Sequence, residues 1–477
     1  MPKTSVGSRS DVEAQQCATR LAAALTADEP ALLSSLDFGP HVTQGDGGGA
    51  RIIIGDQSEI PLLDNPARPV LDHRMALLAD RGDMVVLHTP DAGFQSYVAD
   101  VLGRRGIKWL AAGGHPTDAV AKICRTEAQL FDPLRRFVAD AGGATIQSYL
   151  TTGNTWRLAQ ALGTATGQIV HVAGPAPRIA RRANDKLWFS DLARRVLGHD
   201  AVPPTMYAYG PAAAAGLVRQ LARDNAQVII KVPDSAGSNG NIRLESADIG
   251  DASLHLLCRF LRRHLNIVGW QGRYPLLVGI WESDVVCSPS VQMWLPKVGE
   301  GLPRIEGVFE QRVCGIGAAF VGAERSTLPG AVQARLGSEA LAIAAVLQRL
   351  GYFGQCSFDA VLVQKNDKSL IPHWIECNGR WGGVSIPMTV AADLLEGALP
   401  DGLVIVQTPM GRDGFTTSHL RNCLEPLLFR PGQSTEGIVI LAPPLGGDDP
   451  SLTLMALAQD QIGATRLMDV ALARLRI

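Results

Sequence analysis

The 477-residue chain is 46% apolar and 19% charged, ordinary values for a globular protein long enough for roughly two to four structural units. Its net charge of -2 argues against nucleic acid or a membrane surface as a partner held by bulk electrostatics. No run approaches the ~18 apolar residues of a membrane span. The first residues lack the apolar core of a secretory signal, so we expect a cytoplasmic protein.

The spacing of the cysteines and the small number of lysines further limit the kinds of site that the chain can contain. The eight cysteines are scattered without a C-x-x-C pair, which indicates reduced thiols and not a disulfide framework or a zinc site. Only eight of the 44 basic residues are lysines. Lysine is a compact point charge on a flexible stem and suits phosphate contact, so each lysine is a better functional candidate than usual. The alternative is that several of them are ordinary surface residues.

The first part of the chain alternates short apolar strands with helices. We expect strands at residues 51–55, 84–88, 107–112, 144–149 and 169–172, and helices over 11–27, up to 101, 119–141 and 156–162. This alternation predicts a parallel sheet covered on both faces, that is, a Rossmann-like α/β domain over residues 1–175. The chain lacks G-x-G-x-x-G after the first of these strands, which argues against a dinucleotide-binding role.

A Gly-Pro-Ala-Pro boundary at residue 174 opens a second unit, predicted to span residues 176–399. Its expected helices are 184–198, 212–223, 254–265 and 331–350, and its expected strands are 227–232, 242–244, 274–282, 290–295 and 307–313. Residues 400–477 form a third, smaller unit with strands at 403–407 and 437–442 and helices at 452–457 and 466–475. That unit either helps to close a substrate site or caps the fold.

A loop rich in Gly and Ser follows the strand that ends at Lys231. Such a loop can bring its backbone N–H groups close to phosphate oxygens, and Lys231 would reach the same phosphates. The candidate residues of the loop are Ser235, Gly237, Ser238 and Gly240. No G-K-[ST] closes the loop, so it is not a Walker A motif, and an ordinary hairpin turn is the alternative. Glu282, just past an apolar strand, either accepts hydrogen bonds from ribose hydroxyls or is a solvated loop acid.

Residues 354–383 read as two strands joined by a polar turn. Antiparallel pairing would bring Asp359 on one strand beside Glu376 on the other, with Asn378 and Arg380 following at alternate positions. Two carboxylates and an amide oxygen are ligands that Mg²⁺ takes. An arginine beside them could hold a transferring phosphoryl group. The alternative is a hairpin whose acidic ends are simply solvated.

These elements occur in an order that resembles the ATP-grasp superfamily over residues 175–395. The resemblance rests on Lys186 on a helix, Lys231 before the Gly- and Ser-rich loop, Glu282 after an apolar strand, and Asp359 before an E-x-N-x-R motif at 376–380. The preceding region is similar to the pre-ATP-grasp domain of such enzymes. The layout, with Gln292 and Glu310-Gln311, is most similar to the pheganomycin-type peptide ligases.

The resemblance implies an α/β protein: a Rossmann-like domain, an ATP-grasp fold with antiparallel sheets, and a small C-terminal α/β unit. It implies ATP and Mg²⁺ as cofactors, with Lys186 and Lys231 on the phosphates and with Asp359, Glu376 and Asn378 holding the metal. Arg380 would stabilise an acyl phosphate and the tetrahedral species after it.

The implied partners are a small-molecule carboxylate, which ATP activates, and the amine of a peptide or amino acid, which then displaces phosphate. A homodimer is compatible with the resemblance. Residues 307–317 and 380–385 are the expected acceptor side, and Arg312 is either a further ligand or a structural residue. An ATP-grasp kinase, a ligase with a non-amine acceptor, and an ATP-binding regulatory protein remain as alternatives.

Overall fold

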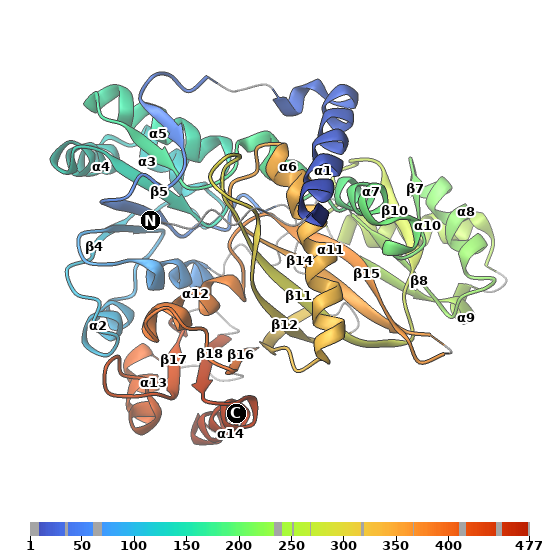
Figure 1. The fold of residues 1–477 in the computed structure, drawn as a ribbon. Helices are drawn as coiled ribbons and strands as arrows, with labels where there is room; N and C mark the ends of the chain where they lie inside the picture. Colours follow the sequence, from blue (N-terminus) through green and yellow to red (C-terminus); the bar gives the residue numbers. More distant parts are fainter. Residues whose placement is uncertain are drawn as a thin grey trace.

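The computed structural model describes residues 9–33, 37–60, 69–232, 241–249, 252–267, 269–315, 319–365, 367–409, 416–444 and 451–475. Within these residues the strands form three sheets of six, four and eight strands. In Figure 1 the six-stranded and four-stranded sheets stand on opposite sides of the molecule, with the eight-stranded sheet between them. The α/β fold class and the antiparallel sheets of the second unit are as predicted.

The N-terminal sheet has the order β1-β6-β5-β2-β3-β4, and all of its neighbouring strands are parallel. Its strands are β1 (Val42–Gln44), β2 (Arg51–Ile54), β3 (Met84–Leu87), β4 (Lys108–Ala111), β5 (Ala144–Ser148) and β6 (Val170–Val172). The connecting helices are η2 (Pro69–Leu78), α2 (Ala92–Asp100), α3 (Val120–Thr126), α4 (Ala128–Ala141) and α5 (Gly153–Thr166). The single helix predicted over 119–141 is two helices, because Glu127 is extended and separates α3 from α4.

The two faces of this sheet pack against different parts of the chain. Along β2, Ile52 and Ile54 join a core made with α3, α4 and α5, whereas Ile53 joins a core made mostly with the C-terminal segment. Successive side chains of a strand point to opposite faces, so the run of three isoleucines is what a sheet covered on both sides requires. One cover is local and the other comes from more than 300 residues away along the chain.

The four-stranded sheet, order β7-β10-β8-β9, is antiparallel and has a core of its own. Its strands are β7 (Thr205–Ala208), β8 (Gln227–Lys231), β9 (Asn241–Glu245) and β10 (Leu276–Ile280). Its helices are α8 (Pro211–Leu221), α9 (Ser246–Ile249) and α10 (Leu254–Ile267). This unit, the small-sheet unit, projects from one side of the molecule in Figure 1.

The eight-stranded sheet, order β15-β14-β11-β12-β13-β16-β18-β17, is antiparallel throughout. Its strands are β11 (Val285–Leu295), β12 (Arg304–Cys314), β13 (Ala319–Arg325), β14 (Gly354–Gln364), β15 (Leu370–Asn378), β16 (Gly402–Pro409), β17 (Gly437–Ile440) and β18 (Ser451–Ala458). The helices α1 (Arg9–Asp28), α6 (Pro177–Ala183), α7 (Lys186–Leu197) and α11 (Gly330–Arg349) accompany it, and α1 packs along α11 (Figure 1).

The helix predicted at 452–457 is wrong, because those residues belong to β18. Every residue of β18 is buried, and the strand pairs with β16 on one side and β17 on the other. Its Leu, Met and Ala residues are good helix formers, but pairing on both edges and burial on both faces outweigh a helix preference of a few tenths of a kcal/mol per residue. The helix predicted at 466–475 is confirmed as part of α14 (Gln461–Leu475).

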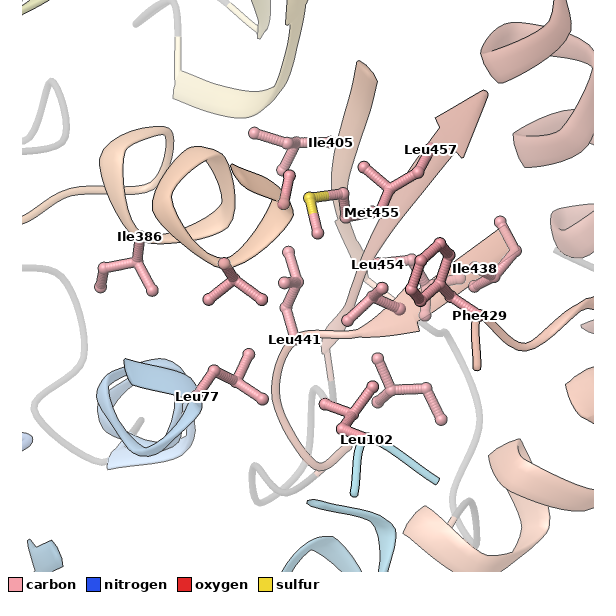
Figure 2. Packing of buried hydrophobic residues seen from close by; sticks show 14 of the residues in the cluster. Leu77, Leu102, Ile386, Ile405, Phe429, Ile438, Leu441, Leu454, Met455 and Leu457 are labelled. Carbon is pink, nitrogen blue, oxygen red and sulfur yellow. The ribbon is translucent and has the colours of Figure 1, made fainter. Parts of the chain in front are cut away.

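The C-terminal segment and the N-terminal domain share one apolar core. Figure 2 shows Leu77 of η2 and Leu102 after α2 beside Leu441, Leu454 and Met455. The remaining cover comes from α12 (Ser385–Leu394), α13 (Thr417–Leu424) and α14. The segment therefore extends the large sheet and also covers the parallel one.

Among the described residues, α11 is the one helix that is long and apolar enough to cross a membrane by length and composition. It packs against β11, β12, α1 and α7, and its apolar residues from Leu336 to Leu347 belong to the core of the large sheet. This packing is that of a core helix, which passes the same test.

Candidate active site

The hairpin of β14 and β15 brings the predicted carboxylates together. Asp359 pairs directly with Glu376 across the two strands, as the sequence pattern predicts. The Ser290 hydroxyl of β11 donates to Asp359 Oδ1 at 2.6 Å, and the Asn378 side-chain amide donates to Asp359 Oδ2 at 2.8 Å. Asp359 is thus held from both neighbouring strands, with Gln292 in turn donating to Ser290 at 2.8 Å.

Two lysines from different elements approach this carboxylate pair. Lys186 is the first residue of α7, whose N-terminus is capped by Asp185, and its side chain is almost fully buried. Its Nζ lies 3.2 Å from Glu376 Oε2. Lys231 ends β8 of the small-sheet unit and is close enough for its charge to act on Glu376. The site is therefore assembled where the small-sheet unit meets the large sheet.

The charges of the site separate the protonation equilibria of its acids. Burial and the neighbouring charge of Glu376 raise the pKa of Asp359 to about 6, against hydrogen bonds from Ser290 and Gln311. Burial acts on Glu376 in the same direction, but the positive charges led by Lys186 outweigh it and lower the pKa of Glu376. Burial, reinforced by the charge of Lys186, lowers the pKa of Lys231 to about 8. A proton taken up by the acid pair therefore goes to Asp359.

A cavity of about 350 Å³ lies between the two sheets. Five of the predicted site residues line it: Lys186, Lys231, Glu282, Asp359 and Glu376. Ile229, Ile280, Trp281 and Val361 supply apolar walls. A volume at the lower end of the range for small-molecule pockets, apolar walls and a few converging charges are the features of a ligand site.

Two cavity residues have partners that sequence reasoning missed. Glu282 Oε1 lies 2.6 Å from Nδ1 of His373, a buried residue of β15. A histidine inside an otherwise apolar strand was the signal for it. Gln311 of β12 lines the cavity and hydrogen-bonds Asp359. The sequence singled out Gln311 for its place in the chain, with no role attached.

Arg380 lies beside the cavity, not in its wall. The extended course that would point it to the side of Glu376 ends at Asn378, because the N–H of Arg380 turns back to the Asn378 carbonyl at 2.9 Å. Its Nη1 donates to Asn184 Oδ1. The guanidinium is still near enough to lower the pKa of Glu376. Arg312, the other candidate arginine, binds Glu324 at 2.8 Å on the neighbouring strand.

Asn184, between α6 and α7, contacts the loop after β15, and the sequence did not predict this contact. Its Oδ1 also accepts from the N–H of Gly379 at 3.1 Å, and its Nδ2 donates to the Gly379 carbonyl at 3.2 Å. This one side chain therefore fixes both the backbone and the guanidinium of the loop after β15. Ser235, Gly237, Ser238 and Gly240 lie outside the described residues, and their contact with phosphate stays a prediction.

The donors present fit a hard divalent cation. Asp359 and Glu376 are adjacent carboxylates, and burial together with the charge of Glu376 raises the pKa of Asp359. Such a pair is stabilised by a cation that takes oxygen ligands, and Asn378 adds an amide next to it. Within the described part of the chain, the closest cation to Glu376 is Lys186.

Comparison with known proteins supports this architecture. A family model described as the pre ATP-grasp domain matches residues 72–164. No curated protein sequence matches the chain. The similar solved structures include biotin carboxylase from Campylobacter jejuni, at 14% identity, TM-score 0.54, and coverage of 89% of this chain and 91% of that one.

Two further structures carry nucleotides. The biotin carboxylase domain of Hydrogenobacter thermophilus 2-oxoglutarate carboxylase, in complex with MgADP and bicarbonate, is 14% identical, with a TM-score of 0.55 and coverage of 89% of each chain. An N5-carboxyaminoimidazole synthase from Aspergillus clavatus, in complex with ADP and 5-aminoimidazole ribonucleotide, is 12% identical, with a TM-score of 0.50 and coverage of 90% of this chain and 99% of that one. Together with the family match, these likenesses show that the chain has the ATP-grasp fold.

Proposed function

We propose that the protein is an ATP-dependent ligase that activates a carboxylate as an acyl phosphate and joins it to an amine, with release of ADP and phosphate. The observation that carries this proposal is the Asp359–Glu376 pair facing two lysines across one cavity. Proteins of the same fold bind ADP, in one case with magnesium, which supports ATP as the nucleotide. Among the described residues that line the cavity there is no Ser–His or Cys–His pair, so the site favours positioning and electrostatics over a covalent acyl-enzyme.

Each residue has a role that follows from its charge and place. Lys186 and Lys231 would bind the phosphates of ATP, and Glu282, oriented by His373, would accept from ribose hydroxyls. Asp359, Glu376 and Asn378 would hold Mg²⁺, which would neutralise phosphate charge when bound. Arg380, held by Asn184, would stabilise the charge that develops on the transferred group.

The chemistry requires two displacements. An oxygen of the substrate carboxylate attacks the γ-phosphorus of ATP, the bond from that phosphorus to the ADP oxygen breaks, and ADP leaves. The amine nitrogen then attacks the carbonyl carbon of the acyl phosphate. The carbon–oxygen bond to phosphate breaks, phosphate carries away the electron pair, and the nitrogen loses a proton to give the amide.

The finer proposal is that the acid resembles an amino acid, that the amine belongs to a peptide or amino acid, and that the product is a peptide natural product made in the cytoplasm. Support comes from the resemblance of the sequence layout to that of pheganomycin-type peptide ligases. Gln292, one of the residues behind that resemblance, is deeply buried and donates to Ser290, which donates to Asp359. Bicarbonate is a second candidate acid, because neighbours of the same fold are carboxylases and one binds bicarbonate.

Product analysis tests the proposal. The protein is incubated with Mg²⁺ and ATP, a panel of carboxylic acids, peptides and bicarbonate, and hydroxylamine as an artificial amine. We expect ADP and a hydroxamate whose formation depends on one acid. AMP with pyrophosphate would contradict acyl-phosphate chemistry, a phosphorylated product without hydroxamate would indicate a kinase, and binding without turnover would indicate a regulatory protein.

A matched pair of variants connects that activity to the site. Glu376→Gln should abolish Mg²⁺-dependent ADP formation while the protein stays folded, since it removes one carboxylate of the pair. Glu324→Gln removes a carboxylate of similar exposure that pairs with Arg312 on the same sheet, outside the cavity, and should leave activity near wild type. Retained activity in Glu376→Gln would show that the metal lies elsewhere.

A further inference from the structure

Two aspartates and a histidine form a buried cluster at the carboxyl end of the parallel sheet. Asp56 follows β2, His88 follows β3, and Asp72 lies in η2, which connects these two strands. The three side chains are at most 9% exposed, and one ligand atom from each lies within 4.8 Å of the other two. They meet because β2 and β3 are parallel neighbours, so the residues after them reach the same edge of the sheet. None of the three lines the active-site cavity.

Gly55 allows η2 to come this close to the end of β2. A Cβ atom on Gly55 would lie 2.3 Å from the Asp72 carbonyl oxygen and 2.6 Å from Leu87 Cδ2. The backbone of η2 therefore packs directly on the residue before Asp56, where any side chain would push it away. The close approach of the two aspartates is thus set by backbone packing.

His88 presents a nitrogen lone pair to the aspartates. Its Nε2 lies 2.9 Å from the Asp118 carbonyl oxygen, which can only accept, so the neutral ring carries its proton on Nε2. The bare Nδ1 faces Asp72 Oδ2 at 3.6 Å, which is too long for a shared proton. Neither Nδ1 nor Asp72 Oδ1 has a hydrogen-bond partner in the described part of the chain. A buried lone pair facing a carboxylate is unfavourable unless a cation lies between them.

The other ligand groups of the cluster are oriented by the backbone. Asp56 Oδ1 accepts from the Ser58 N–H, and Asp56 Oδ2 accepts from the Val120 N–H, each at 2.8 Å. These bonds leave a second lone pair on each oxygen. Together with the bond from His88 to Asp118, they are the kind of outer contact that holds metal ligands in place.

Arg74 is the cation whose charge acts on Asp72. Its Nε contacts the Leu71 carbonyl at 3.4 Å, and its Nη1 has no hydrogen-bond partner among the described residues. The guanidinium therefore does not occupy the space between the ligand atoms. Two carboxylates against one guanidinium also leave the cluster with a net negative charge, which favours a further cation.

We propose that Asp56, Asp72 and His88 bind a divalent transition-metal ion, with Zn²⁺ as the ion that fits best. Zinc makes bonds of about 2.0 Å to nitrogen and oxygen, so two of its tetrahedral ligands lie about 3.3 Å apart, close to the 3.6 Å between Nδ1 and Oδ2. Asp72 Oδ1 offers a fourth donor atom. The imidazole favours zinc over magnesium. Structural zinc sites are closed to solvent, so the burial of these groups suits one.

The ion would have a structural role. It would tie η2 to the ends of β2 and β3, and η2 carries Leu77 into the core shared with the C-terminal segment (Figure 2). The proposal does not depend on the ligase function. Absence of hydroxamate in the product analysis would leave it intact, and a chain without bound zinc would leave the ligase function intact.

Zinc binding can be measured on the full chain without turnover. The protein is stripped with EDTA and dialysed against Zn²⁺ in excess Mg²⁺, which occupies the Asp359–Glu376 pair, and its zinc content is measured by inductively coupled plasma mass spectrometry. We expect one Zn²⁺ per chain in the wild type and in Glu376→Gln, with a higher thermal midpoint than the stripped protein in both. A wild type without zinc, or zinc that is lost in Glu376→Gln, would overturn the proposal.

Variants of the cluster then locate the ion. His88→Gln and Asp72→Asn should each weaken Zn²⁺ binding by about 100-fold or more in isothermal titration, because each removes a ligand. Two controls should keep the wild-type affinity: His115→Gln, an exposed histidine after β4, and Asp83→Asn, a buried aspartate that binds Arg51 at the start of β3. Equal affinity in His88→Gln, Asp72→Asn and the wild type would overturn the proposal.

If neither cluster variant folds, X-ray absorption at the zinc edge of the wild type decides. We expect one imidazole nitrogen and oxygen ligands at about 2.0 Å. The chain has eight cysteines, so sulfur is the competing ligand. Scattering from sulfur at about 2.3 Å would place the zinc on thiols and would overturn the proposal.

Discussion

At the scale of single residues, the site depends on opposite shifts in neighbouring groups. Asp359 and Glu376 face each other, and Lys186 forms an ion pair with Glu376, so the proton affinity of the acid pair is concentrated on Asp359. The pKa of Lys231 is lowered, which favours its neutral form. Displaced pKa values of this kind cluster at functional sites.

These shifts predict a bell-shaped pH profile for kcat/KM of ATP. Asp359 must be ionised to hold the metal, so activity falls as pH drops through about 6. Lys231 must be charged to bind phosphate, so activity also falls as pH rises through about 8. Steady-state ADP release measured from pH 5 to 10 checks both limbs. Lys231→Arg should remove the alkaline limb alone, and a profile that is flat between pH 7 and 9 in the wild type would contradict the role of Lys231.

Asp359 also predicts a stability effect in the absence of metal. Its folded pKa of about 6 lies above the ordinary 3.8, so the folded state binds the proton more tightly and loses stability as pH rises from about 4 to 6. Above pH 6 the cost is up to about 3 kcal/mol. Asp359→Asn should therefore unfold at higher urea than the wild type at pH 7.5 without Mg²⁺. A difference that does not change between pH 4 and 7.5 would argue against this cause.

At the scale of elements, the loop after β15 is fixed by a residue from another element. Asn184 binds Gly379 through both its oxygen and its nitrogen and holds Arg380 in place. Arg380→Ala should reduce transfer to hydroxylamine by ~100-fold, as for other preorganised donors, with ATP binding retained.

Asn184→Ala should reproduce part of that loss, about tenfold in kcat, because the guanidinium remains but is no longer held. KM for ATP should stay near wild type, since Lys186 and Lys231 are intact. Asn225→Ala is the control, as Asn225 makes a similar contact with the Leu221 carbonyl in the small-sheet unit. An equal fall in kcat for Asn184→Ala and Asn225→Ala would mean that the loss is general destabilisation.

Features set by interactions between residues close in sequence could be predicted, and features set by contacts between distant segments could not. The β14–β15 hairpin, and with it the Asp359–Glu376 pairing, could be predicted because apolar runs and a polar turn are local signals. The strand β18 could not, since its neighbours β16 and β17 decide its state and its own residues favour a helix. Asn184, His373 and Arg74 acquire their partners, or lack them, only through contacts between distant segments.

At the scale of the whole molecule, the apolar cores do not follow the order of the three units along the chain. One core lies within the small-sheet unit, and another is shared by the N-terminal domain and the C-terminal segment. The small-sheet unit has its own apolar core, and its first and last strands are neighbours, with Thr205 paired to Gly279. The segment beyond residue 400 has no such independence. Its strands continue the large sheet through the pairing of β16 with β13, and its apolar side chains cover the parallel sheet.

Two deletions test this division. Replacing residues 205–279 by a short Gly/Ser linker should leave a protein that melts cooperatively near the wild-type midpoint, because the removed core is closed on itself and its ends are adjacent. Removing residues 400–477 should instead abolish the cooperative transition, since it exposes Leu77, Leu102 and Ile386, which pack in the shared core (Figure 2). Circular dichroism melts and resistance to protease check both. A chain of residues 1–399 that melted cooperatively and resisted protease would show that the C-terminal segment is a separable cap.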